Sequence, residues 1–213
     1  MIRKNLKLLP LIFSIMISSC YRQVYPNIVL SCDPPCWNGI IPGESNKLFV
    51  LEILRENPEI DQETIENSLI HHFLFTDVVS WSFSEGGEGI AYFENDVLTQ
   101  IEFRKTKYSL DYLITEFGDP DFVLMTPYWG REINIWLLYS DRGVLLHYTK
   151  NLSSNNFVRI GPKDKIKNIT YFDRKIEQKI LESISRSARD FYGKSLEILM
   201  QKWTGYGEIE IRK

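Results

Sequence analysis

The chain holds three cysteines, Cys20, Cys32 and Cys36, and all of them lie in one short stretch near its start. Thiols at such spacings can form a disulfide, hold a metal or carry out redox chemistry. A zinc site needs about four ligands, and no further Cys or His pair completes one. Redox motifs usually have two residues between their cysteines, whereas "CDPPC" has three. The pattern favours a Cys32–Cys36 disulfide in a loop stiffened by prolines, with zinc binding and redox catalysis as alternatives.

The histidines offer little else that could do chemistry. His71 and His72 with Asp77 could ligate a metal, but adjacent helical residues point about 100° apart and do not easily share one. His147 lies in an alternating strand pattern, and no serine or cysteine nucleophile motif accompanies it. The glycines of "GGEG" lack the Lys-Ser/Thr of a phosphate loop. The sequence therefore predicts no catalytic residue, no metal site and no cofactor.

The first nineteen residues have the layout of a secretory leader. Three basic residues open it, an apolar run from Leu8 to Ile17 follows, and Ser18 and Ser19 close it. The run is about half the roughly twenty residues that a spanning helix needs. We therefore expect the leader to direct export and then to be removed.

The end of that leader, Ile17-Ser18-Ser19-Cys20, resembles the bacterial lipoprotein box. The resemblance implies that Cys20 becomes the first mature residue, with diacylglycerol on its sulfur and an acyl chain such as palmitate on its amino group. Two or more chains hold a protein stably to a bilayer. The implied location is the cell envelope, on the extracytoplasmic face of a membrane. The alternative is an ordinary signal peptide cut nearby, which leaves Cys20 a free thiol.

Size and charge bound the class of the mature protein. The 194 residues from Cys20 onward suit one large domain or two small ones. The chain is 44% hydrophobic, which is enough for a core. Of its 25 basic residues three lie in the leader, so 22 remain against 28 acidic ones, a net charge of −6. An acidic balance without a basic stripe argues against nucleic-acid binding.

Hydrophobic periodicity predicts an α+β fold, with helices packed on antiparallel sheet. We expect a leader (1–19), a tether with the disulfide clip (20–44), a first α+β unit (45–107), a second one (108–172) and C-terminal helices packed on the same domain (173–213). Ser45 and Asp61 are predicted to cap two helices, and Asn95-Asp96 to form a hairpin turn. Further helices are expected over 109–117, 173–190 and 196–203. Each unit reads as an imperfect helix-plus-three-strand repeat.

The two units, "IIPGESNKLFVLEIL…WSFSEGGEGIAYFENDVLTQIEF" and "SLDYLITEFGDPDFV…INIWLLYSDRGVLLHYT", resemble the BamE (SmpA/OmlA) lipoprotein domain. A helix that ends in Phe117-Gly118-Asp119-Pro120 is the shared cue of the second unit, and the first unit lacks it. Tandem copies also resemble the beta-lactamase inhibitory protein fold. The resemblance covers residues 40–149 and implies an extracytoplasmic domain that binds other proteins. Function belongs to sites rather than to folds, so it implies no particular pathway.

One group of aromatic residues suggests a partner-binding surface. In "INIWLLYS" the residues Trp136 and Leu138 share one strand face, and Trp129 and Arg131 lie in a nearby loop. Such residue types are enriched at protein interfaces. The alternative is that the apolar stripe of helix 173–190 covers this face and buries it.

These patterns together predict a non-catalytic lipoprotein of the cell envelope, with a binding or structural role. Its expected partners are the lipid bilayer, through acylated Cys20, and an envelope protein that the sequence does not identify. Two alternatives stay open: an exported hydrolase with a dispersed site, and a module that binds a small ligand.

Overall fold

The computed structural model describes residues 32–68, 77–127, 131–153, 157–192 and 200–210. In chain order the elements are α1 (Lys47–Glu56), β1 (Ile60–Ser68), β2 (Asp77–Phe83), β3 (Glu88–Glu94), β4 (Val97–Arg104), α2 (Leu110–Phe117), β5 (Phe122–Pro127), β6 (Glu132–Tyr139), η1 (Ser140–Arg142), β7 (Val144–Asn151), β8 (Phe157–Ile160), β9 (Asn168–Phe172), η2 (Arg174–Ile176), α3 (Glu177–Tyr192), β10 (Met200–Lys202) and β11 (Gly207–Glu210).

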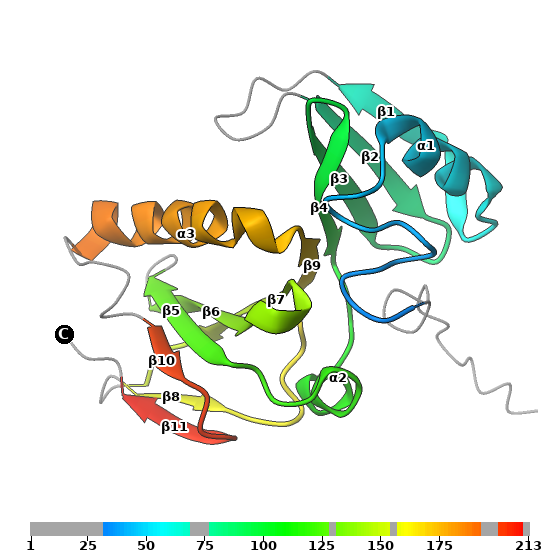
Figure 1. Cartoon of the computed structure of the whole chain (residues 1–213). Coiled ribbons are helices and arrows are strands. Elements are labelled where there is room, and N and C mark those ends of the chain that lie inside the picture. Colours follow the sequence, from blue (N-terminus) through cyan, green and yellow to red (C-terminus); the bar gives the residue numbers. More distant parts are fainter. Residues whose placement is uncertain (1–31, 69–76, 128–130, 154–156, 193–199, 211–213) are drawn as a thin grey trace, which may run out of the picture.

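Nine of these strands form one antiparallel sheet in the order β1-β2-β3-β4-β9-β7-β6-β5-β10. Strands β1 to β4 make one end of the sheet, β5 to β7 lie toward the other, and β9 joins them (Figure 1). Strand β9 pairs with β4 on one side and with β7 on the other. A separate two-stranded sheet pairs β8 with β11. The two expected units therefore share one continuous sheet.

The prediction of an α+β fold built from helix-plus-three-strand units is wrong, because the chain is dominated by this sheet. The residues after Asp61, expected to form a helix that Asp61 caps, belong instead to the edge strand β1 (Ile60–Ser68). Residues 200–202, expected in a final helix, form β10 against β5. In both places pairing with a neighbouring strand outweighs the local four-residue spacing of apolar side chains, since tertiary context overrides weak propensity.

Three predicted helices are confirmed, with one change of cap. Helix α1 is capped by Asn46, whose Oδ1 accepts the Phe49 N–H at 2.9 Å, whereas the Ser45 hydroxyl accepts the Ile41 N–H instead. Helix α2 follows Ser109 and ends at Gly118, whose φ of 75° suits glycine. Asp173 begins the turn η2 that leads into α3. The cap moves by one residue because both candidates are small polar side chains.

The predicted hairpin between β3 and β4 is also confirmed. Asn95 and Asp96 both have positive φ, 53° and 68°, as a two-residue turn with the twist of the strands requires. Asn and Asp tolerate this conformation better than other residues with side chains. The register that follows directs alternate residues of both strands into the core.

The sheet buries both of its faces over part of its area. Its core face packs against α1, α2, the β8–β11 pair and the segment after the clip. The largest buried side chains of this core are Trp37, Trp81, Tyr139, Tyr148, Tyr171, Phe93 and Phe103. The opposite face, called here the helix face, carries Leu124, Leu138, Leu145 and Phe172. Ile176 of η2 and Ile180, Leu181 and Ile184 of helix α3 cover these four residues. The long amphipathic helix thus packs where its apolar stripe finds apolar strand residues.

Candidate binding surfaces

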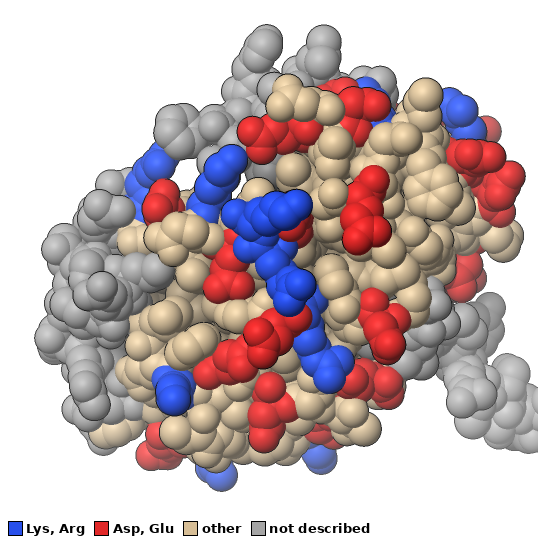
Figure 2. Space-filling model, in the orientation of Figure 1, with Lys and Arg blue, Asp and Glu red and all other residues tan. Residues whose placement is uncertain are grey.

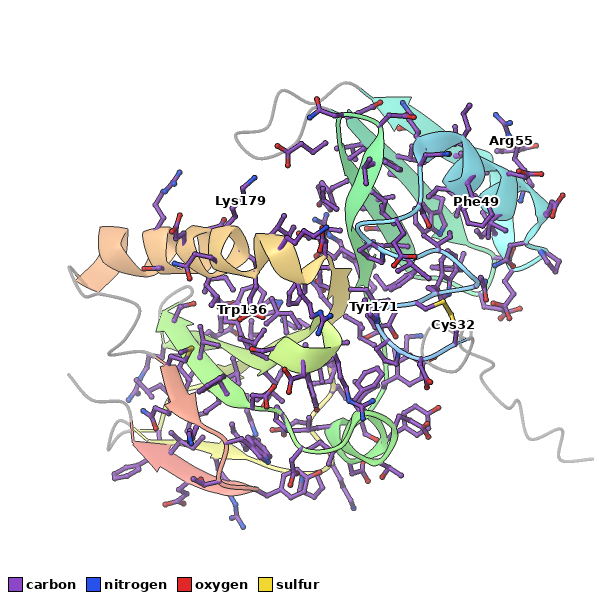
Figure 3. All side chains as sticks on the ribbon, viewed as in Figure 1. Cys32, Phe49, Arg55, Trp136, Tyr171 and Lys179 are labelled. Atoms are coloured by element: carbon purple, nitrogen blue, oxygen red, sulfur yellow. A yellow bond between two sulfur atoms is a disulfide. The ribbon has the colours of Figure 1, made fainter. Side chains whose placement is uncertain are left out.

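The predicted aromatic surface on β6 lies on the helix face. Leu138 is 1% exposed and packs with Ile180 and Ile184 of α3 in the same apolar cluster. Trp136, labelled in Figure 3, is half-buried at the margin of that cluster. Arg131 is exposed, and Trp129 lies outside the described residues. The geometry is that of the alternative interpretation, in which the C-terminal helix covers the face, so Trp136 and Leu138 are packing residues here.

His147 is part of the same packed face. Its imidazole stacks on the Trp136 ring with 3.9 Å between centroids, and its Nε2 lies 2.9 Å from the Asn134 Oδ1. Burial lowers the pKa of His147 to about 4, and the nearby Lys167 adds to this. The imidazole is therefore neutral at physiological pH. Within the described residues its hydrogen-bond partner is the Asn134 amide rather than a carboxylate, and its other nitrogen, Nδ1, is buried without a hydrogen-bond partner.

A carboxylate network crosses the neighbouring strands of the sheet. Glu102 on β4 accepts hydrogen bonds from the Tyr92 hydroxyl at 3.2 Å, from Arg104 at 2.9 Å and from the Asn168 amide at 2.9 Å. Burial and the Glu102 charge raise the pKa of Tyr92. The carboxylate has donors from three strands and an ion-pair partner. These hydrogen bonds link the side chains of β3, β4 and β9 in one network.

The part of the chain that the structure describes contains no cluster of side chains that could bind a metal ion. No group of three or more His, Cys, Asp or Glu side chains gathers there. His71 and His72 lie outside the described residues, and Asp77 forms an ion pair with Lys47. None of the described helices is long and apolar enough to cross a membrane.

The disulfide clip lies at the start of the folded part of the chain. Cys32 and Cys36 form a disulfide, and Cys36 is buried. The next residue, Trp37, is 1% exposed and stacks on Trp81 at 5.8 Å between centroids, with Phe103 against its edge. The bridge therefore leads directly into the aromatic centre of the core, and Cys32 lies where the described chain begins (Figure 3).

A depression of about 320 Å³ lies between the clip and the start of α3. Its walls are Pro34, Pro35, Ile41, Pro42, Gly43, Glu44, Asp141, Asp173, Arg174 and Lys175. Arg174 donates to the Asp141 carbonyl at 3.3 Å, and Asp173 accepts the Lys175 N–H at 3.0 Å. Three carboxylates face two cations, so the depression is polar and of mixed charge.

The clearest exposed apolar surface lies at the first turn of α1. The described chain exposes four large apolar side chains, and three of them gather there: Leu48 at 75%, Phe49 at 37% and Val97 at 38%. Val97 is close because Asn46, the residue before α1, forms a β-bridge with it. Hydrophobic periodicity assigns Leu48 to the apolar side of this helix, yet the structure leaves it exposed. Six of the ten residues of α1 are apolar, but only Val50 and Leu54 are buried. This excess of apolar residues over what one buried side can hold is the sequence feature that indicates an exposed apolar surface.

No protein-family model matches the chain, and comparisons with curated proteins and with solved structures find no match.

Proposed function

We propose that this protein is an exported lipoprotein, held at the extracytoplasmic face of a membrane by acylated Cys20, which binds another protein of the cell envelope without catalysing a reaction. The observation that carries the proposal is the Cys32–Cys36 disulfide at the start of the folded body. Disulfides persist in compartments outside the reducing cytosol. The leader pattern before Cys20 points to the same compartment.

The distance between anchor and clip suits a surface tether. Twelve residue steps separate Cys20 from Cys32, and an extended chain advances at most about 3.5 Å per residue. The clip then lies within about 40 Å of the acylated cysteine. A folded body on such a tether stays close to the membrane and can still reach a partner beside it.

The surface that best supports protein binding is the first turn of α1. Leu48, Phe49 and Val97 are apolar, exposed and adjacent, whereas Leu138 of β6 is buried under α3 and Trp136 is half-buried at the margin of the same cluster. Contiguous exposed apolar groups on a protein surface mark interaction sites more often than scattered ones do. The imidazole of His147 stacks on Trp136, and burial lowers its pKa to about 4, so it would be a weak base for hydrolysis. The geometry therefore favours binding over hydrolysis.

A second function, the binding of a small polar molecule, rests on the depression beside the clip. Its volume of about 320 Å³ is at the lower end for ligand sites, and its walls carry both charges. Arg174→Ala combined with Asp141→Ala should remove such binding and leave capture of a protein partner unchanged.

Intact mass of the chain isolated from bacterial membranes tests the anchor and the clip together. We expect a chain that begins at Cys20 and carries diacylglycerol and an acyl chain, with a gain of two hydrogens on reduction. Cys20→Ser is the control, and it should release the chain from the membrane fraction. A wild-type chain without lipid, or with free thiols before reduction, overturns the proposal.

A further inference from the structure

We propose that the outer surface of α1 and β1 docks a cationic amphipathic segment of a protein partner. This inference rests on the proposed function, because it names the partner that the anchored protein would bind. It combines two observations on neighbouring elements: an exposed apolar surface on a helix, and a group of exposed carboxylates beside it.

The apolar part is formed by one side of α1. Successive helical residues advance by about 100°, so Leu48 and Phe49 lie on the side opposite the buried Val50 and Leu54. Val97 extends this surface from β4, since the Lys47 N–H bonds the Asp96 carbonyl at 3.1 Å beside it. Helix α1 lies at one end of the molecule (Figure 1). These side chains can therefore meet a partner without any change in the fold.

The carboxylates come from α1, its C-terminal turn and β1. The exposed acidic residues between positions 52 and 66 are Glu52, Glu56, Glu59, Asp61, Glu63 and Glu66. The exposed cation in the same stretch is Arg55, labelled in Figure 3, and the Lys47 charge is already paired with Asp77. This stretch therefore exposes six negative charges and one positive charge. Acidic side chains also predominate at this end of the space-filling view (Figure 2).

Helix and strand present these charges on one surface. The Gln62 amide of β1 donates to the Leu54 carbonyl at 3.0 Å and to the Asn57 carbonyl at 3.4 Å, which holds β1 against the end of α1. Strand β1 is an edge of the sheet, so no further strand lies beyond it in the described fold. Leu48 and Phe49 are three or four residues from Glu52, the spacing at which helical side chains are neighbours. Glu52 therefore adjoins the apolar residues, and the carboxylates of β1 lie on the strand that packs against the end of the same helix.

The negative charge of this surface indicates which kind of molecule would bind to it. A segment with lysines or arginines beside leucines pairs with the carboxylates and covers Leu48 and Phe49. A second copy of this chain is disfavoured, because the mature chain itself carries a net charge of −6. Anionic lipid is repelled for the same reason. A basic amphipathic protein segment is the occupant that satisfies both observations.

Labelled synthetic peptides test the inference by fluorescence anisotropy. The protein is the complete mature chain with Cys20→Ser, which removes lipid as a competing surface. One peptide carries leucines and lysines at helical spacing, a second carries leucines and glutamates, and a third carries lysines and serines. We expect the leucine–lysine peptide alone to bind, with an affinity that falls as salt is added.

Variants locate the binding. Leu48→Asn should weaken the affinity about tenfold, and Glu52→Gln with Glu56→Gln should weaken it and flatten its salt dependence. Tyr206→Ser and Glu208→Gln are matched controls, since they remove an exposed aromatic ring and an exposed charge elsewhere, and both should bind as the parent chain does.

Four results overturn the inference: no binding, equal binding of the glutamate or serine peptide, binding that Leu48→Asn leaves unchanged, and self-association of the chain that Leu48→Asn abolishes. The last result would make a second copy the occupant. If the peptide does not bind but the mass experiment finds a lipidated chain, only the docking surface on α1 and β1 is refuted. A chain without lipid refutes the proposed function instead.

Discussion

The Trp81 indole occupies the space that a side chain on Gly89 would need. The two residues face each other across β2 and β3, and a Cβ on Gly89 would lie 2.1 Å from the Trp81 Cε2. The ring has little room to move, because Trp37 stacks on it. A glycine is required at this point by packing rather than by an unusual backbone angle.

Gly89→Ala should therefore lower the free energy of unfolding by about 1–3 kcal/mol or more, the cost of forcing extra volume into a packed core. Urea unfolding followed by tryptophan fluorescence measures it. Gly161→Ala is the control, because a Cβ there meets no atom closer than 3.9 Å and the expected change is within about 0.5 kcal/mol. Equal stability of both variants would show that Trp81 does not pack on Gly89.

The pKa of His147 predicts a pH dependence of stability. The unfolded imidazole titrates near 6.5, while burial holds the folded pKa at about 4. The unfolded chain therefore binds a proton that the folded chain does not bind between these values. The contribution of His147 to the free energy of unfolding is fully present above pH 6.5, and it falls by about 3 kcal/mol as the pH drops to 4.

His147→Phe isolates this effect, because phenylalanine retains a ring against Trp136 and does not titrate. Urea midpoints measured from pH 7 to pH 4 should fall less steeply for the variant than for the wild type. Parallel curves for the two proteins would assign the pH dependence to other groups.

The cover of the helix face by α3 makes Ile184 a core residue. Ile184→Ala should cost about 2–5 kcal/mol, since it removes buried methyl groups and leaves a cavity. Ser183→Ala, at the neighbouring exposed position, should change stability by less than about 0.5 kcal/mol. Thermal unfolding of both variants checks this, and a neutral Ile184→Ala would mean that α3 does not cover the sheet.

Removal of the clip should have a modest effect. The double variant Cys32→Ser with Cys36→Ser opens a five-residue loop, which corresponds to about 2 kcal/mol on the chain-entropy model. A reducing agent should lower the melting temperature of the wild type and leave that of the double variant unchanged. A similar response of both proteins to reductant would rule out the bridge as its cause.

Local signals explain the parts of the fold that sequence reasoning predicted. The Asn95-Asp96 turn, the end of α2 at Gly118 and the start of α3 after Asp173 all depend on a few adjacent residues and their backbone angles. Such features are specified within one turn of chain, so a single sequence reveals them.

The errors have a common cause, which is pairing over long distances in the sequence. Ile60 to Ser68 form a strand because β2 is available to pair with them, and Met200 to Lys202 do so because β5 is. The exposure of Leu48 is also a tertiary fact, since several sides of α1 are apolar and only packing selects the buried one. A binding surface made of such surplus residues is hidden from periodicity, which assigns every apolar residue to the core.

The position of β9 has a consequence for how the chain reaches its final state. Residues 168–172 are synthesised after β1 to β7, yet they close the sheet by pairing with both β4 and β7. Until they arrive, each half of the sheet has an open edge with unpaired backbone groups, which favours aggregation. Such non-local pairing is slow. A chain that ends before residue 168 should therefore yield two half-sheets that are prone to aggregate, instead of a smaller stable protein.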